Sequence, residues 1–279
     1  MDGGSPYDQP EPRGWPLVQA TLRIVVAVQC WGVAANWLSG GAHAAAFEFA
    51  MEHGGMAASA ASRLDNIIAV AMLACGVLTL TRPCWPVLLP VAGWMVSESV
   101  FKLILNDQWL EPAEHAVRYL APLALILIDF WPPRLKFALG WAAMALWMLR
   151  AGAAATFAGH GLVAIFQSGT GGPFVGLITH SAENVLGVAV TEDQARVALA
   201  VIGGVDIGVA MNILICRSRG VAFWMMFWGF AAAASRVTAY GPERYYDILI
   251  RIANGGVPAV IWLYWMRAIR EQPSTLIPR

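Results

Sequence analysis

The residues best suited to chemistry lie early in the second half of the chain. His160 stands between two glycines, and His180 begins the segment His-Ser-Ala-Glu-Asn, which ends in Glu183 and Asn184. On a helix, Glu183 and Asn184 would share a face with His180. A histidine and a glutamate three residues apart occur in carboxylate-bridged metal sites, which also need further carboxylates. This region offers too few of them, so we assign no metal.

A second candidate is Asp206, which lies inside an apolar segment after Gly203 and Gly204. The two glycines would allow a neighbouring helix to approach closely. A carboxylate in an apolar helix needs a partner or water, and we expect Arg236 or Arg251 to supply the partner. Asp206 is then either half of a buried ion pair or part of a ligand or proton site.

The first half contains a comparable polar group in Glu114, His115 and Arg118. Arg118 follows Glu114 by one helical turn, a spacing that favours an ion pair. Glu98 and Lys102 have the same spacing, and we expect them to pair with each other. No catalytic residue can be assigned. The candidates for ligand binding are His160, His180, Glu183, Asn184, Asp206, Arg236, Arg251, Glu114, His115 and Arg118.

The composition shows which elements must position these side chains. Of 279 residues, 58% are hydrophobic and 13% are charged, whereas a soluble domain has about 25% charged residues. We therefore predict an all-α integral membrane protein, with the lipid bilayer as its main partner. Lys and Arg total 18, as do Asp and Glu, so no basic excess indicates nucleic acid. The four cysteines are expected to be buried apolar residues.

About 20 apolar residues are needed for a helix to cross a bilayer. Eight segments approach this length: 17–38, 64–81, 85–105, 113–131, 135–158, 194–216, 220–240 and 246–266. We expect about eight transmembrane helices as two tandem four-helix bundles. The domains would be a soluble tail at 1–16, a first unit at 17–133, a second unit at 134–268 and a cytoplasmic tail at 269–279.

Charges are sorted between alternate connections. One set, with the C-terminal tail, holds Arg82, Arg134, Lys136, Arg217, Arg219, Arg267, Arg270 and Arg279. The other set holds all five histidines and many carboxylates. Positive residues in short loops mark the cytoplasmic side, so both termini are predicted to be cytoplasmic. Two exterior connections, 39–63 and 159–193, are long and contain apolar stretches, which predict short helices.

At the exterior end of the helices, three interpretations of His160 and His180 stay open. Each can be a hydrogen-bonded histidine at the lipid–water interface. The two can line a pocket for a quinone headgroup or another small molecule. They can also bind a metal or haem. Quinone and haem are therefore the cofactors to consider, and neither has a diagnostic motif.

The chain also contains an internal similarity. Residues 32–41 (GVAANWLSGG) align with residues 152–161 (GAAATFAGHG), so that Gly32 matches Gly152. Residues 114–131 align with 247–264, so that Glu114 matches Asp247 and Arg118 matches Arg251. Each half is thus expected to pair a carboxylate with an arginine one turn later. Four helices per unit would give two copies with the same orientation.

One long exterior loop after the first helix, followed by three helices, resembles the DoxX-like membrane family. The second helix of each unit, Ile67–Arg82 and Val201–Arg217, is a small-residue run that ends in a basic turn. The closing helices carry Arg118 before Pro122 and Arg251 before Pro258. The resemblance implies a bacterial inner-membrane location and an association with redox chemistry, but no catalytic residue set.

Three functions follow as hypotheses. The first is an accessory or structural subunit of a membrane redox or respiratory complex, with other membrane subunits as partners. The second is a quinone- or haem-linked oxidoreductase component with its site at the exterior interface. The third is a small-molecule transporter, which is disfavoured because no helix is clearly broken at the membrane midplane. Whether the protein is an enzyme is undecided.

Overall fold

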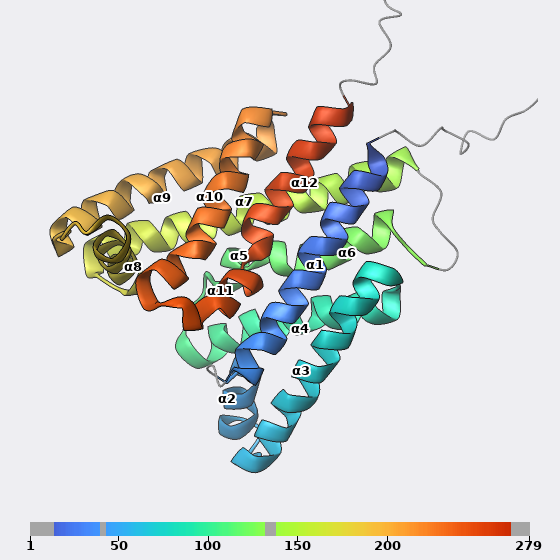
Figure 1. Cartoon of the computed structure of the whole chain (residues 1–279), viewed down its shortest axis with the longest axis horizontal. Helices are drawn as coiled ribbons and strands as arrows, with labels where there is room; N and C mark the ends of the chain where they lie inside the picture. Colours follow the sequence, from blue (N-terminus) through green and yellow to red (C-terminus); the bar gives the residue numbers. More distant parts are fainter. Residues whose placement is uncertain (1–13, 40–42, 132–137, 269–279) are drawn as a thin grey trace, which may run out of the picture.

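The computed structural model describes residues 14–39, 43–131 and 138–268, and all secondary structure in these ranges is helical (Figure 1). The first half contains α1 (Trp15–Leu38), α2 (Ala45–Glu52), α3 (Ala58–Thr81), α4 (Trp85–Asn106), α5 (Glu111–Glu114) and α6 (Ala116–Ile128). The second half contains α7 (Leu139–Thr170), α8 (Pro173–Ser181), the π-helix η1 (Ala182–Leu186), α9 (Glu192–Ile215), α10 (Arg219–Tyr240), η2 (Pro242–Arg244), α11 (Tyr245–Ile250) and α12 (Ile252–Ala268). The predicted all-α class is confirmed.

Six helices of the described part are long and apolar enough to cross a membrane: α1, α3, α4, α7, α9 and α10. A seventh crossing is counted if the segments Pro242–Ile250 and Ile252–Arg267, bent by 45° at their junction, are taken as one span. The eighth expected helix, 113–131, is broken at His115. Its longer part, α6, has 13 residues, or about 20 Å of helix, which is shorter than the roughly 30 Å hydrocarbon core.

The long connections differ in part from the prediction. The short helices α2 and α8 lie within them, as expected. The helix predicted over 135–158 instead begins at Leu139 and continues to Thr170, because the residues after His160 extend its apolar face. It ends at Gly171, which has φ +81°, a conformation that favours glycine.

The two halves exchange helix contacts instead of forming separate bundles. In the first half α1 packs on α3, and in the second half α7 packs on α9. Across the halves, α1 also packs on α11 and α12, while α7 packs on α5 and α6 (Figure 1). Gly32 approaches the backbone of Leu249 and Ile250, and Gly152 approaches α6. Buried side chains of both halves therefore form one continuous core.

Two arginines stabilise the ends of neighbouring helices. Arg23 on α1 pairs with Asp129 and donates to the Leu80 carbonyl at 3.1 Å, near the end of α3. Arg150 on α7 is buried and donates to the carbonyls of Ile213 and Leu214, at the end of α9. A cation at a helix C-terminus satisfies free carbonyls and interacts favourably with the helix dipole.

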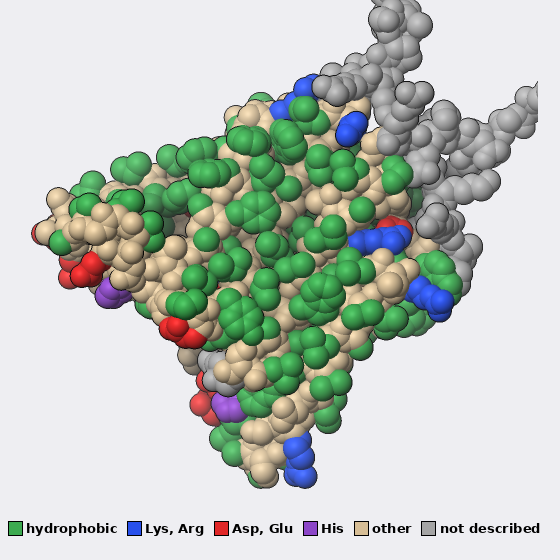
Figure 2. All heavy atoms as spheres, in the orientation of Figure 1, with side chains coloured by type: hydrophobic (Ala, Val, Ile, Leu, Met, Phe, Trp, Pro, Cys, Tyr) green, Lys and Arg blue, Asp and Glu red, His purple; other side chains and the backbone are tan. Residues whose placement is uncertain are grey.

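The outer surface is largely hydrophobic, as Figure 2 shows for one face. Large apolar side chains on α3, α9 and α10 are exposed, among them Ile67, Val70, Val197, Val201 and Phe227. On the face shown, most basic side chains lie along the upper and right edges, and acidic and histidine side chains lie at the left and lower corners. Such an apolar belt is compatible with membrane insertion.

Candidate functional site

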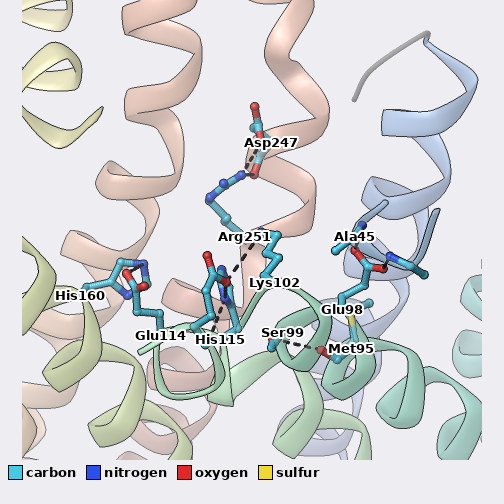
Figure 3. A network of polar contacts seen from close by, with 12 residues as sticks. Ala45, Met95, Glu98, Ser99, Lys102, Glu114, His115, His160, Asp247 and Arg251 are labelled. Atoms are coloured by element: carbon cyan, nitrogen blue, oxygen red, sulfur yellow. Dashed lines mark hydrogen bonds and ion pairs between the residues drawn. The ribbon is translucent and has the colours of Figure 1, made fainter. Parts of the chain in front are cut away.

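The candidate site lies around two breaks in the closing helices of the halves. His115 separates α5 from α6 with φ −110° and ψ 12°, and Arg251 separates α11 from α12 with φ −95° and ψ 6°. Both breaks turn polar side chains into the protein interior (Figure 3). At the second break, Arg251 forms an ion pair with Asp247, as the sequence predicted. Asp247 also accepts a hydrogen bond from Arg244 at 2.8 Å.

Lys102 and Glu98 do not form the predicted ion pair. Lys102 lies 3.7 Å from a carboxylate oxygen of Glu111. Glu98 instead accepts the backbone N–H groups of Ala45 and Ala46, both at 3.0 Å, and so holds the first turn of α2 (Figure 3). A helix N-terminus is a favourable place for a carboxylate because its free N–H groups point at it.

Near the first break, the pKa values of two buried carboxyl groups are shifted in opposite directions. Burial raises the pKa of Glu111, but the hydrogen bond from His115 and the charges of Lys102 and Arg118 outweigh it and lower the pKa to about 2. Burial and the adjacent Glu111 carboxylate raise the pKa of Glu114 to about 7. Burial and the charge of Arg118 hold the pKa of His115 well below its ordinary value. Glu114 is therefore the group of this cluster that titrates near neutral pH.

His160 joins this first-half cluster. Its Nδ1 is 2.8 Å from the Thr156 carbonyl, so Nδ1 carries a proton and Nε2 is directed toward Glu114. The distance from Nε2 to Glu114 Oε1 is 3.9 Å, and the His115 and His160 rings are 6.3 Å apart (Figure 3). α7 therefore brings a second-half histidine to the first-half break.

Two partly buried arginines complete the cluster. Nε and Nη2 of Arg118 and Nε of Arg236 have no hydrogen-bond acceptor among the described residues. The predicted Arg118–Glu114 pair does not form within hydrogen-bonding distance in this part of the chain, although the two charges act on each other. Desolvated donors without acceptors are costly in a protein interior, so these guanidinium groups are suited to an anionic ligand.

Two partly open cavities of about 220 Å³ each lie among the described helices. The first cavity is lined mainly by α1, α3 and α4, with Asp65, Glu98 and Lys102 among its polar residues. The second cavity is lined mainly by α7, α8, α9 and α10, and it is largely apolar. Arg251 lines both cavities. The break between α11 and α12 thus lies where the two cavities adjoin.

Asp206 lines the second cavity but has neither of its predicted partners. Within the described ranges, no ion pair joins it to Arg236 or Arg251. The indole N–H of Trp228 donates to its carboxylate, and Oδ1 has no hydrogen-bond partner. The prediction of close helix approach is confirmed at Gly203, where an added Cβ would lie 2.5 Å from the Gly161 carbonyl oxygen.

His180, Glu183 and Asn184 do not join His160. His180 is exposed and packs near the Tyr240 ring, with ring centroids 6.3 Å apart. Glu183 is exposed on η1, a π-helix in which the expected α-helical spacing does not hold. Asn184 donates to the carbonyls of Thr238 and Ala239 near the end of α10. In the described part of the chain, no group of three His, Cys, Asp or Glu has a metal-site arrangement.

The polar lining of the first cavity was missed from the sequence. Asp65 is buried on α3 and lies 3.3 Å from Nδ1 of His43. The sequence placed Asp65 at the end of a predicted helix, where a carboxylate is unremarkable. Because α3 begins at Ala58, Asp65 lies two turns inside the helix. The apolar character of residues 58–61 was the signal for this longer helix.

Comparisons of the chain with protein-family models, with curated proteins and with solved structures found no match. The DoxX-like resemblance stays a prediction from the sequence. The function must therefore be argued from the site.

Proposed function

We propose that this protein is a membrane transporter for a small organic anion, which binds around the break between α11 and α12. The observation that carries the proposal is the position of Arg251, which borders both interior cavities. Membrane transporters commonly bind solutes where helices are interrupted between two repeated units. No clearly broken helix was expected from the sequence, but the last apolar segment is interrupted at Arg251, between α11 and α12.

The charges around the break favour an anion. Asp247 is engaged by Arg244 and Arg251, and Glu111 by Lys102 and His115. Arg118 and Arg236 retain guanidinium nitrogens without acceptors in the described ranges. An anionic solute would supply those acceptors, and a guanidinium group offers several donors in fixed geometry for this purpose.

The proposal includes a duplicated unit. α3 and α9 both have 24 residues, and α4 and α10 both have 22. Counted from the first residues of these helices, Ile68 corresponds to Ile202, and each lines the cavity of its half. Lys102 corresponds to Arg236 in the same way. Such agreement in position and in lining supports two copies of one ancestral unit.

With α6 counted as a short span and α11–α12 as one broken span, the chain would cross the membrane eight times. Both termini would lie on the cytoplasmic side of a bacterial inner membrane. The basic residues of alternate connections support this orientation. A reporter fused to the C-terminus should be active in its cytoplasmic form, and a reporter active only in the periplasm would overturn the orientation.

Transport is tested with purified protein in proteoliposomes. The probe is benzenesulfonate, whose sulfonate stays ionised and does not cross lipid as a neutral acid. Uptake into the vesicles should exceed that into protein-free vesicles and should be lost in Arg251→Gln. The matched control is Arg63→Gln, because Arg63 is exposed and bonds only within its own helix. Equal uptake with and without protein would rule out transport of this anion class.

A second candidate is favoured by one observation: His160 and Arg236 line the same, largely apolar cavity. That combination fits a quinone headgroup, with the ring in the cavity and a carbonyl accepting from Arg236. In the quinol form, a hydroxyl would donate to Nε2 of His160. The test is extraction of the purified protein for quinone. Bound quinone would support this function, and its absence from protein purified in mild detergent would count against it.

The accessory-subunit hypothesis and its redox association stay predictions from the sequence. Co-purification with cytochromes in a larger assembly would support them over a transporter that acts alone.

A further inference from the structure

The second cavity contains a specific set of unsatisfied polar atoms. Among the described residues that line it, Nε of Arg236 has no hydrogen-bond acceptor, and Oδ1 of Asp206 and of Asn254 has no donor. The remaining lining is mostly apolar, with Phe174 and Trp228 among its aromatic members. A chain that buries one free donor and two free acceptors in one cavity is complementary to a ligand with the opposite groups.

The donor and the carboxylate acceptor belong to different parts of this cavity. Arg236 lies against Phe174, with its guanidinium carbon 5.6 Å from the ring centroid. Asp206 lies beside Trp228 and is packed against the Gly161 region of α7. No ion pair joins Arg236 and Asp206 in the described part of the chain. Their charges are thus left for two separate groups of a ligand.

We propose that the second cavity binds an aromatic carboxylate that carries a hydroxyl group at its far end. The carboxylate accepts hydrogen bonds from Arg236, the ring packs between the aromatic side chains, and the hydroxyl donates to Asp206. At about 220 Å³, the cavity is larger than the roughly 150 Å³ that accommodates benzene in an apolar protein interior. The site rests on the proposed transport function for its role, but binding can be measured separately.

The size and charge of the first cavity make it the natural control. It has the same volume, but Lys102 there is already close to Glu111. Its lining is also the more polar of the two, with Asp65 and Glu98 among its residues, so it suits an aromatic ring less well. We therefore assign the aromatic acid to the second cavity alone.

The experiment is calorimetric titration of the full chain in lipid nanodiscs with three probes. These are 3-(4-hydroxyphenyl)propanoate, 3-phenylpropanoate, which lacks the hydroxyl, and 3-(4-hydroxyphenyl)propanamide, which lacks the charge. The first should bind at least about tenfold more tightly than either of the others, because each analogue leaves a buried group without a partner. Equal affinities for all three, or no binding of the first, would overturn the proposal.

Variants locate the two ends of the ligand. Arg236→Gln should abolish the preference for the charged probe, and Asp206→Ala should abolish the preference for the hydroxyl while the preference for the carboxylate remains. Lys102→Gln, at the corresponding position of the first half, should leave both preferences intact. If Lys102→Gln removes binding and Arg236→Gln does not, the ligand occupies the first cavity and the proposal is wrong.

A second pair of variants avoids the ionisable residues, whose replacement can disturb folding. Ala164→Phe fills the second cavity and should weaken binding at least about tenfold, whereas Ala69→Phe fills the first cavity and should not. The opposite result would overturn the proposal. If 3-(4-hydroxyphenyl)propanoate binds but benzenesulfonate is not taken up, the transport function is contradicted and the site in the second cavity stands. If benzenesulfonate is taken up but the hydroxyphenyl acid does not bind, transport stands and the proposed site is wrong.

Discussion

The two halves of the protein have similar helices but different cavity chemistry. Trp94 and Trp228 stand at corresponding positions of α4 and α10, and each lines the cavity of its half. In contrast, Glu98 corresponds to Ala232, and Met72 to Asp206. The positions that shape the helices are alike, whereas the ionisable side chains have been moved. A duplicated scaffold can thus carry two sites of different polarity.

The sequence directed attention first to the histidines of the second half, and the structure places polar side chains of the first half beside them. The first cavity is lined by His43, Asp65, Glu98 and Lys102, and so it is the more polar of the two. His160, the histidine that singled out the second half, lies next to Glu114 of the first half. The site is built by the contact between the halves.

The largest loss of stability, and the largest difference in stability between corresponding variants of the two halves, is expected at the arginines that bind the ends of α3 and α9. Arg23→Met should lower the free energy of unfolding by about 3–5 kcal/mol, because it leaves the buried Asp129 carboxylate unpaired. Arg150→Met should cost less, about 2 kcal/mol, because it removes bonds to carbonyls and leaves no charge behind. Unfolding titrations in mixed micelles measure both values.

The control for this comparison is Arg23→Met combined with Asp129→Leu, which should recover most of the loss. If both single variants cost the same, the paired charge in the first half is not what distinguishes the two arginines.

Glu114→Gln should change the pH dependence of stability. The folded pKa of about 7 lies above the ordinary 4.5, so folding favours the protonated form. The stability that the protein gains from the protonated Glu114 is complete below pH 4.5 and is lost as the pH rises to 7. The free energy of unfolding falls by about 3 kcal/mol over this range. Lys102, Arg118, Arg236, His160 and Glu111 face this carboxyl.

The glutamine variant should therefore unfold at a higher temperature than the unmodified protein at pH 8, and at about the same temperature at pH 4. Thermal unfolding at the two pH values measures the effect. Glu48→Gln, at an exposed position, is the control and should follow the unmodified protein. If the unfolding temperature of Glu114→Gln still falls between pH 4.5 and 7, the raised pKa of Glu114 is not the cause of the pH dependence.

Gly203→Ala should disturb the second half alone. Its Cβ would meet the Gly161 carbonyl oxygen at 2.5 Å, and overpacking of this kind costs about 1–3 kcal/mol. The first half already has Ala69 at the corresponding position of α3. Gly204→Ala is the matched control, because nothing lies within 4 Å of its added Cβ, and it should be neutral or stabilise by up to about 1 kcal/mol. Similar unfolding free energies for the two variants would mean that α7 and α9 are not in close contact.

The smallest effect on stability is expected for variants that loosen the short helices α2 and α8. Glu98→Gln should cost about 1–2 kcal/mol, because an amide has one oxygen to accept the two N–H groups at the start of α2. On α8 the corresponding attachment is a neutral bond, 2.8 Å long, between Ser181 and Thr238, so Ser181→Ala should cost less. Hydrogen exchange of the amides of α2 and α8 would show local opening in each variant. Equal protection of α2 with and without Glu98 would refute this attachment.

Several features followed from the sequence alone, because they depend on local composition and spacing. Long apolar segments predicted helices, and their number was nearly right. The ion pair of Asp247 and Arg251 was predictable because residues four apart share one helix face. The short helices after α1 and α7 were indicated by apolar residues in otherwise polar connections.

Partners far apart in the sequence were decided by the tertiary structure. Glu98 binds the start of α2 and not Lys102, and Asp206 meets Trp228 and not an arginine. In an apolar interior a polar side chain takes whichever partner the packed helices bring within reach, and local spacing cannot tell which one that is. The breaks at His115 and Arg251 lie where α7 packs on α5 and α6 and where α1 packs on α11 and α12. The sequence alone thus determined an apolar helical chain with charged groups inside it, and the packing of helices across the halves decided where those groups meet.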